Sequence, residues 1–290
     1  MSTSTIVRPL LKWAGGKSRL APQICAAFGA PCRGTYYEPF IGSGSVFFYR
    51  RAMGMVNKAV LSDANDKLIE VHRAVRDDVR GVLDKLDQLP KDDWRERYYE
   101  VREDYNGGPP RGMLHAARFL WLNRAGFNGL YRENKKGIYN VPVGKYAKLS
   151  FPTSEHFERI SEFLQGVELV SGGFAEVMKE AGEHDHVYCD PPYVPLTETA
   201  NFTGYYKAAF GWDEQKSLRD SARRAAFSGA KVVLSNHDLP VVRQELYPSK
   251  LGFKYVSRPR VARAISRKAV SRKAVVEVIA AIGPLSREVA

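Results

Sequence analysis

The segment YYEPFIGSGSVFF, residues 36–48, carries the clearest signal of the fold. An apolar run ends at Glu38, two glycines follow, and a second apolar run begins at Val46. This order predicts a buried strand, a tight glycine turn and the start of a helix. Gly42 and Gly44 would let a ligand approach the backbone at the end of the strand.

The glycine turn is not the dinucleotide-binding fingerprint G-x-G-x-x-G, because Phe47 stands where the last glycine would be. An acidic residue that binds ribose hydroxyls is expected about 20 positions further along the chain. Asp63, which ends the apolar run KAVLSD (58–63), matches that position. Taken alone, the turn is equally compatible with a structural tight turn and with a ligand site.

The segment KWAGGKS, residues 12–18, is similar to the end of a phosphate-binding P-loop, but Leu11 stands where that loop requires glycine. This departure excludes an ATPase or kinase. Trp13 offers a flat face for an adenine ring or a sulfonium cation, and Lys17 offers a charge for a carboxylate. A tryptophan buried in the core is the alternative interpretation of Trp13.

Apolar runs that end in polar residues recur along the chain. Besides 58–63, they predict strands at 167–172, 186–190, 231–236 and 274–282. A helix before Pro90 is predicted by apolar residues at every third or fourth position, namely Leu68, Val71, Val75, Val79, Leu83 and Leu86. A second helix is predicted from Asp213, as N-cap, to Phe227, with Gly229 past its end. Strands that alternate with helices indicate an α/β fold with a mostly parallel, doubly wound sheet.

Residues 75–156 differ from the sequence on either side. They are rich in charged and aromatic residues, contain the helix breaker NGGPPRG (106–112) and lack apolar strand runs. The length suits one large domain that carries a smaller insertion. We predict a sheet domain formed by 1–74 and 157–290, with 75–156 as an inserted helical domain.

The chain is basic, with 44 Lys and Arg against 32 Asp and Glu and a formal charge of +12. Such an excess suits a nucleic acid partner, with a solvated cationic surface as the alternative. The tandem repeat SRKAV (266–270 and 271–275) belongs to a stretch that has no acidic residue and that could either contact phosphates or form a solvated loop. Its basic residues are Arg258, Arg260, Arg263, Arg267, Lys268, Arg272 and Lys273.

The cysteines Cys25, Cys32 and Cys189 form no C-x-x-C pair, which favours a reducing compartment. The N-terminal residues lack the pattern of a secretory leader, and no run approaches the ~20 apolar residues that cross a bilayer. We therefore expect a cytoplasmic protein without a membrane partner, and a monomer in solution.

The segment VYCDPPYV, residues 187–194, is an apolar strand that ends in Asp190, Pro191, Pro192 and Tyr193. The lone pair of an exocyclic amine such as adenine N6 is delocalised into the ring, so attack by this amine requires acceptors for its two N–H groups. Asp190 can accept one N–H and the Pro191 carbonyl the other, while Tyr193 can stack on a base swung out of a duplex. This chemistry is positioning plus electrostatics, without a metal. A structural Pro-Pro turn is the alternative.

Several segments together resemble the Dam-type (D12 class) DNA adenine-N6 methyltransferases, in the family's order and over nearly the whole chain. They are KWAGGK, EPFIGSGSVF, LNRAGFNGLYRENKKGIYNVPVGKY (122–146), YCDPPY with ANFTGY (200–205), and LSNHD (234–238). The resemblance implies a Rossmann-like methyltransferase domain with an inserted DNA-recognition domain. It also implies S-adenosylmethionine as methyl donor, no metal, and double-stranded DNA as substrate, with GATC as the preferred target.

The resemblance also implies roles for individual residues. Trp13, Lys17, Asp63 and Asp190 would contact S-adenosylmethionine, beside the turn residues Glu38, Pro39, Phe40, Gly42 and Gly44. Asp190, Pro191, Pro192 and Tyr193 would form the catalytic element. Arg124, Phe127, Asn128, Leu130, Arg132 and Pro142 would contact DNA.

The chemistry of the DNA-contact residues suits these roles. An arginine can pair bidentately with guanine, and leucine or proline can pack on a thymine methyl group. Phe127 lies where the family often has a tyrosine that fills the space left by a flipped base, and a phenyl ring can do the same. The SRKAV repeat falls where relatives tend to have a glycine-containing loop, so the resemblance does not extend to that loop.

Two other functions remain open at the level of sequence. The first is methylation of cytosine N4, RNA adenine or a protein glutamine. Asp190 suits adenine N6, whereas cytosine N4 enzymes tend to have Ser at this position and glutamine enzymes Asn. The second is a DNA-binding protein that has lost catalysis, against which the acidic residues Asp63 and Asp190 argue. A zinc deaminase is excluded because the sequence lacks the P-C-x-x-C part of its signature, although His156 and Glu158 have the H-x-E spacing.

Overall fold

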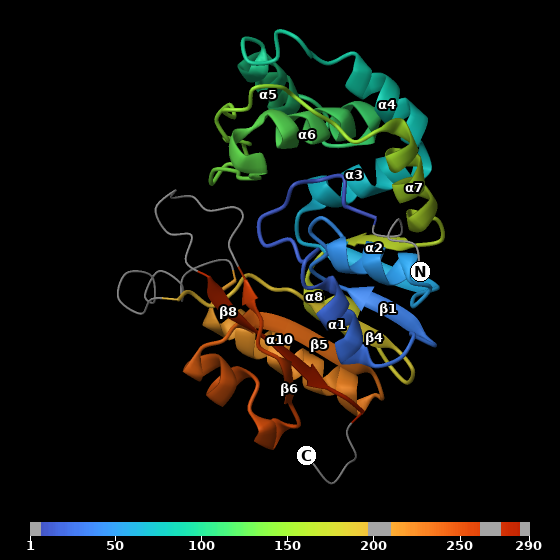
Figure 1. Ribbon diagram of the computed structural model, residues 1–290, viewed down its shortest axis with the longest axis vertical. Helices are drawn as coiled ribbons and strands as arrows, with labels where there is room; N and C mark the ends of the chain where they lie inside the picture. Colours follow the sequence, from blue (N-terminus) through green and yellow to red (C-terminus); the bar gives the residue numbers. More distant parts are fainter. Residues whose placement is uncertain (1–6, 197–209, 262–273, 285–290) are drawn as a thin grey trace.

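The computed structural model describes residues 7–196, 210–261 and 274–284. Its strands are β1 (Thr35–Glu38), β2 (Lys58–Asp63), β3 (Glu168–Ser171), β4 (His186–Cys189), β5 (Lys231–His237), β6 (Lys254–Ser257), β7 (Arg260–Val261) and β8 (Val275–Ile282). They form one sheet in the order β3-β2-β1-β4-β5-β8-β6, and β7 pairs with β8 (Figure 1). Strands β1 to β5 are parallel, whereas β8 is antiparallel to β5, β6 and β7. The predicted mostly parallel sheet is confirmed.

The helices are α1 (Ala21–Phe28), α2 (Ser45–Ala52), α3 (Asp66–Asp77), α4 (Val79–Asp87), α5 (Tyr98–Gly107), α6 (Gly112–Ala125), α7 (Ser154–Leu164), α8 (Phe174–Met178) and α10 (Trp212–Phe227). Short helical turns are η1 (Phe127–Gly129), η2 (Val242–Leu246) and η3 (Ser249–Leu251). In Figure 1, α4, α5 and α6 lie together at the top, away from the sheet. None of the helices that the structure describes is long and apolar enough to cross a membrane.

Alternate residues of the central strands enter two different cores. Tyr36 of β1 and Tyr188 of β4 pack in a cluster with α1, α2, α3 and α7. Tyr37, Val187 and Cys189 on the same two strands pack in a second cluster with α8 and α10. Because successive strand residues point to opposite faces, both faces of the sheet are covered by helices. This arrangement is the predicted doubly wound, Rossmann-like α/β fold.

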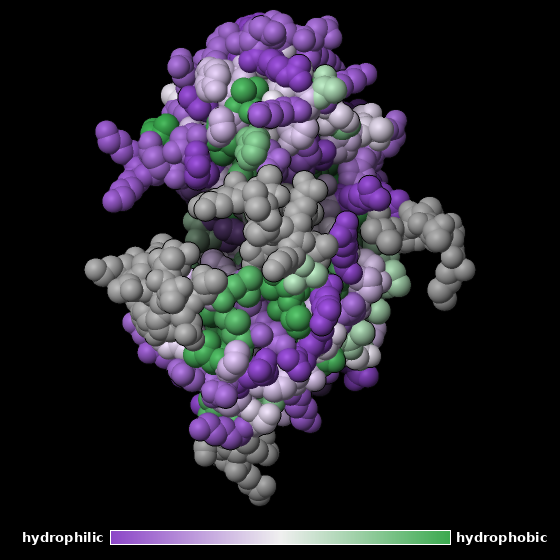
Figure 2. Space-filling model, turned by 60° about the vertical axis from the view of Figure 1, so that its left-hand side comes forward, coloured by the Kyte–Doolittle hydropathy of each residue, from purple (hydrophilic) through white to green (hydrophobic). Residues whose placement is uncertain are grey.

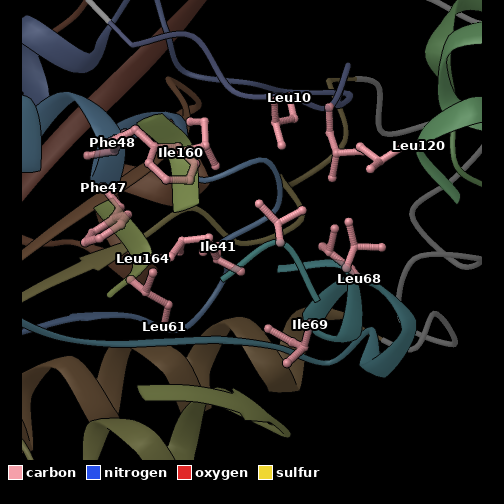
Figure 3. Packing of buried hydrophobic residues seen from close by; sticks show 14 of the residues in the cluster. Leu10, Ile41, Phe47, Phe48, Leu61, Leu68, Ile69, Leu120, Ile160 and Leu164 are labelled. Carbon is pink, nitrogen blue, oxygen red and sulfur yellow. The ribbon is translucent and has the colours of Figure 1, made fainter. Parts of the chain in front are cut away.

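The helical region at the top of Figure 1 shares the first core with the sheet. Leu120 of α6 belongs to the same cluster as Leu68 of α3 and Leu61 of β2, as Figure 3 shows. Leu10, from the segment before α1, and Ile160 of α7 complete this continuous packing. The helical region is therefore fixed to the sheet by buried apolar contacts.

Two helix predictions were wrong in detail. The single helix predicted before Pro90 is two helices, α3 and α4, which meet at Asp78 (φ −152°, ψ 74°). The Asp78 carboxylate accepts the Gly81 N–H at 2.9 Å and caps the second helix, while the apolar spacing continues across the break. The N-cap of α10 is Gly211 instead of Asp213, because Glu214 at the third helical position accepts the Gly211 N–H at 2.7 Å.

Candidate active site

The predicted site residues meet at one edge of the sheet. Glu38 ends β1, Asp63 ends β2, and Asp190 directly follows β4. Strand β1 lies between β2 and β4, and all three run parallel. Their carboxyl ends therefore lie side by side, at the edge where ligands of open α/β sheets bind.

Asp190 is held through one of its two carboxylate oxygens. Lys17 Nζ lies 3.0 Å from Asp190 Oδ1, and Ser235 Oγ donates to the same oxygen at 2.9 Å. Lys17 is buried, donates to the Gly15 carbonyl at 2.6 Å and lies 4.7 Å from the centre of the Tyr193 ring. Among the residues that the structure describes, no hydrogen bond reaches Asp190 Oδ2. This oxygen is the acceptor that the site leaves open.

The turn after Asp190 is fixed by side chains of β5 and α10. Asn236 Oδ1 accepts the Val194 N–H at 3.1 Å, and His237 Nδ1 lies 2.6 Å from the Val194 carbonyl. Gln215 Nε2 donates to the Pro192 carbonyl at 2.6 Å, and its Oε1 accepts from Asn236 Nδ2 at 3.1 Å. Asn236 and Gln215 are only 0% and 1% exposed. These hydrogen bonds hold the backbone of the turn rigidly.

These turn-holding residues were not predicted as site residues. Ser235, Asn236 and His237 belong to the segment LSNHD, which served only to identify the family resemblance. Gln215 lies inside a predicted helix, and nothing in its local sequence marks it. The sequence feature that could have identified Ser235, Asn236 and His237 is their position as a polar run at the end of an apolar strand.

Tyr193 is fixed at both ends of its side chain. Its hydroxyl donates to Glu277 Oε2 on β8 at 3.0 Å, and its ring meets the edge of the His237 ring at 4.9 Å. The ring is half-buried, and the neighbouring Pro192 is exposed. Tyr193 thus presents part of an aromatic surface beside Asp190.

The glycine turn packs directly against Trp13. Gly42 (φ 50°) has no room for a side chain, because a Cβ there would lie 2.8 Å from Trp13 Cδ1. The Gly42 N–H donates to Asp63 Oδ2 at 3.1 Å, and the Asn65 N–H donates to Asp63 Oδ1 at 3.0 Å. Burial raises the pKa of Asp63, and these backbone hydrogen bonds oppose the rise. Gly44 also has a positive φ of 76°, which favours glycine.

Glu38 is a buried acid at the centre of the site, only 2% exposed. Burial raises its pKa to about 8, with a further contribution from the negative charge of Asp190. A 2.6 Å hydrogen bond from the Tyr36 hydroxyl and the charge of Arg50 act in the opposite direction. Burial and the charge of Asp190 therefore favour the protonated form of Glu38.

Three phenylalanines form an aromatic cluster beside the turn. The ring of Phe40 lies 5.6 Å from that of Phe174 and 5.5 Å from that of Phe210, and the last two are 5.8 Å apart. Phe174 begins α8, after β3, and Phe210 precedes α10. Phe40 was predicted from the sequence, but the other two were not, because only the sheet brings them together.

The predicted DNA-contact residues lie in and around a short irregular segment. Asn128 has a left-handed backbone (φ 54°) within η1. The Phe127 N–H donates to the Pro142 carbonyl at 2.9 Å, so these two residues are neighbours. Leu130 is half-buried directly after η1. The structure thus brings these four residues together.

Arg132 and Arg124 differ in their surroundings. Arg132 is exposed, and its Nε and Nη2 donate to Asn140 Oδ1 and the Asn140 carbonyl at 2.6 and 3.0 Å. Arg124 is half-buried and donates to the Leu10 carbonyl. Burial lowers the pKa of Arg124. Arg132 is available at the surface, whereas Arg124 already links α6 to the N-terminal segment.

Comparisons with known proteins show the family of this chain. The family model of the D12 class N6 adenine-specific DNA methyltransferases matches residues 13–262. The chain belongs to this family. It is 35% identical to the Type II methyltransferase M1.LlaDCHI of Lactococcus lactis over 94% of each chain. It is likewise 35% identical to the DNA adenine methylase of Escherichia coli over 96% of each chain.

Among solved structures, TrmN from Thermus thermophilus covers 92% of this chain and 48% of its own length, with a TM-score of 0.40 and 13% identity. The family assignment rests on the family model and on the sequence relatives. It confirms the predicted enzyme class, an adenine-specific DNA methyltransferase. Cytosine N4, RNA and protein acceptors, and a protein without catalysis, are less consistent with it.

Some predictions lie outside the described residues. They concern the N-terminal residues 1–6, ANFTGY (200–205), the tandem SRKAV repeat apart from Ala274 and Val275, and the basic residues from Arg263 to Lys273. In the ranges that the structure describes, there is no group of three or more His, Cys, Asp or Glu side chains that could hold a metal ion. The three cysteines are buried and free.

Proposed function

We propose that this methyltransferase transfers a methyl group from S-adenosylmethionine to N6 of an adenine flipped out of duplex DNA, within the site GATC. The observation that supports this most directly is the state of Asp190. Lys17 and Ser235 both engage Oδ1, while Oδ2 remains an acceptor at the ligand-binding edge of the sheet.

The residues at the sheet edge fit the methyl donor. The turn at Gly42 has no room for a Cβ because the Trp13 ring packs against it, so the turn holds Trp13 beside the carboxyl ends of the strands. The Asp63 carboxylate ends a strand where ribose hydroxyls can be bound. Trp13, Lys17, Asp63 and Asp190, with Glu38, Pro39, Phe40, Gly42 and Gly44, would hold the donor. When bound, S-adenosylmethionine supplies an electrophilic methyl group on a positively charged sulfur.

The catalytic turn supplies acceptors for the adenine amine. Asp190 Oδ2 accepts one N6–H, and this hydrogen bond increases the electron density on N6 and stabilises the positive charge that forms there. The Pro191 carbonyl accepts the second N–H, because the Pro192 carbonyl is already bonded to Gln215. The hydrogen bonds of Gln215 and Asn236 keep both acceptors in place before the reaction.

Tyr193 suits a stacking role for the flipped base. Its hydroxyl bond to Glu277 and its contact with His237 fix the ring beside Asp190. An aromatic ring held in this way stacks on a base at little entropic cost, since the ring is already ordered. Phe127, next to the Pro142 backbone, would fill the space that the base leaves in the duplex.

The helical region suits the DNA duplex. In Figure 2, its surface at the top of the molecule is predominantly hydrophilic. Arg132 is exposed and braced by Asn140, as a residue that pairs with guanine requires. Arg124, Asn128, Leu130 and Pro142 would complete the DNA contacts, and the net charge of +12 favours the polyanion.

The test uses purified protein, labelled S-adenosylmethionine and two duplexes of equal composition, one with GATC and one with that site scrambled. The methylated nucleoside is identified by mass. N6-methyladenine in the first duplex alone is the expected result. Methylation of both duplexes would exclude GATC as the target, and methylation of neither would contradict the proposed reaction on DNA.

A further inference from the structure

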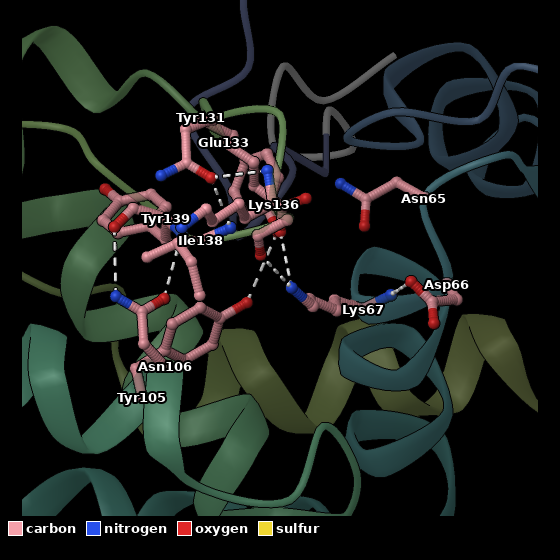
Figure 4. A network of polar contacts seen from close by, with 12 residues as sticks. Asn65, Asp66, Lys67, Tyr105, Asn106, Tyr131, Glu133, Lys136, Ile138 and Tyr139 are labelled. Carbon is pink, nitrogen blue, oxygen red and sulfur yellow. Dashed lines mark hydrogen bonds and ion pairs between the residues drawn. The ribbon is translucent and has the colours of Figure 1, made fainter.

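A lysine beside the predicted donor site bonds to residues of the segment that is predicted to contact DNA. Lys67 lies in the first turn of α3, four residues after Asp63. Its Nζ donates to Glu133 Oε1 at 2.6 Å and to the Gly137 carbonyl at 2.9 Å (Figure 4). One ammonium group therefore bonds to two points of a segment about 70 residues further along the chain.

The segment that Lys67 holds is a tight hairpin, residues 131–140, which we call the recognition hairpin. Glu133 and Tyr139 form an antiparallel bridge across it, and the Asn140 N–H donates to the Arg132 carbonyl at 3.1 Å. Arg132 is exposed, whereas Glu133 bonds to α3 through Lys67. Because neighbouring residues of an extended chain point to opposite sides, fixing Glu133 also fixes Arg132.

Aromatic side chains hold the same hairpin against the donor site. The Tyr131 hydroxyl donates to Glu133 Oε1, the oxygen that Lys67 also engages. The Tyr131 ring stacks on Trp13 at 5.8 Å and on Phe119 of α6 at 4.9 Å. Asp63 and Trp13 are both predicted to contact the donor. Trp13 contacts the recognition hairpin directly through Tyr131, and Asp63 lies four residues before Lys67, which bonds to the hairpin.

The ion pair also removes a negative charge from the DNA-facing segment. Glu133 is next to Arg132 in the chain, and an unpaired carboxylate there would repel phosphates. The side chains of Lys67 and Glu133 are 22% and 27% exposed, compared with 55% and 79% for the surface pair Lys91 and Asp87. The Lys67–Glu133 pair is therefore less screened by water than an ordinary surface pair.

We propose that Lys67 and Glu133 are positioning residues for target recognition. They hold the recognition hairpin on α3 so that Arg132 meets its base while the start of the same helix borders the methyl-donor site. This role presupposes the proposed function, because it concerns the choice of the DNA sequence that is methylated.

The experiment compares Lys67→Met, Glu133→Gln and the double variant with the full-length wild type. The matched control is Lys91→Met, which breaks the exposed pair with Asp87 and makes the same change in net charge. For each protein, kcat and KM are measured on the duplex that the wild type methylates fastest. The same constants are measured on duplexes that differ from it by one base pair.

Lys67→Met is expected to reduce the preference for the best duplex by about 10-fold. The loss appears as a higher KM for that duplex with kcat retained, since the catalytic turn is untouched. Glu133→Gln has a smaller effect, because its amide oxygen still accepts from Lys67. The double variant is less impaired than Lys67→Met, because no unpaired carboxylate remains. Lys91→Met behaves as the wild type.

The possible results separate this role from the proposed function. An inactive wild type would overturn both. An active wild type with unchanged preference in Lys67→Met, or additive losses in the double variant, would overturn the positioning role alone. If Lys67→Met fails to fold, Glu133→Leu, which removes the acceptor for Lys67 altogether, decides the matter. Reduced preference at an unchanged melting temperature supports the role, and unchanged preference contradicts it.

Discussion

The proposed catalytic turn (190–194) and the proposed recognition hairpin are both irregular segments, but they are held in different ways. Buried amides hold the turn, with Asn236 and Gln215 at most 1% exposed. The pair of Lys67 and Glu133, which is about a quarter exposed, holds the hairpin. Loss of a buried polar partner costs about 1–3 kcal/mol, and loss of a partly exposed ion pair costs less. The turn is built for precise geometry, and the hairpin can change with less cost to the fold.

The largest expected effect in this comparison comes from the turn itself. Asp190→Ala removes the proposed acceptor for N6–H and should lower the transfer rate by at least about 10³-fold. DNA binding should persist, because the recognition residues are unchanged. Single-turnover transfer and duplex binding are measured in parallel, with the exposed Asp87→Ala as control. An equal loss of binding would show that Asp190 has another role.

Substitution of a residue that holds the turn in place should have the next largest effect on the transfer rate. Gln215→Met removes the donor to the Pro192 carbonyl and the partner of Asn236, so the acceptors lose their fixed position. We expect kcat to fall by about 10²-fold with the KM for DNA unchanged. The control is Gln244→Met on the surface. A raised KM with normal kcat would instead place Gln215 in DNA binding.

In the recognition hairpin, a single substitution should change specificity more than rate. Arg132→Ala should reduce discrimination at one guanine position by about 1–3 kcal/mol, because a bidentate pair is lost. Relative kcat/KM values on duplexes changed at one base pair measure this effect, with Lys135→Ala as control. A uniform loss on all sequences would identify Arg132 as a phosphate contact.

The smallest effect is expected on the pH dependence of stability. The pKa of Glu38 is raised from its ordinary 4.5 to about 8, so its contribution to stability is complete below pH 4.5 and is lost as pH rises towards 8. Glu38→Gln cannot ionise and should flatten this loss. Between pH 6.5 and 9 we expect its melting temperature to fall by about 2–4 °C less than that of the wild type.

The measurement is thermal unfolding at both pH values without ligand. The pH range begins at 6.5 because, below this pH, protonation of His186 changes the stability of the fold in the opposite direction. Burial and the charges of Arg50 and Lys231 lower the pKa of His186 to about 4, so stability is lost as pH falls from 6.5 towards 4. Equal pH dependence in Glu38→Gln and the wild type would mean that Glu38 is ionised in the folded protein.

The strand ends were the most predictable part of the site. The run KAVLSD matches β2 from Lys58 to Asp63, because a buried strand is an apolar run that stops where the chain reaches the ligand edge. The break at Asp78 was not predictable, because the apolar spacing of α3 continues into α4 and hides it. The missed aromatic residues Phe174 and Phe210 belong to separate strand–helix units, and only packing reveals that they meet Phe40.

The sequence by itself determined strands β1 to β5 and β8, the acidic residues Glu38, Asp63 and Asp190 at the ends of three of them, and the family to which the chain belongs, but it did not reveal β6 and β7. These are local patterns of a few residues, and local patterns are visible in one dimension. Only the tertiary structure decided that Ser235 and Lys17 share one oxygen of Asp190. It also decided that Lys67 reaches Glu133. Such contacts join residues dozens to hundreds of positions apart, and they exist only because the order of the strands and the packing of α3 against α6 bring them together.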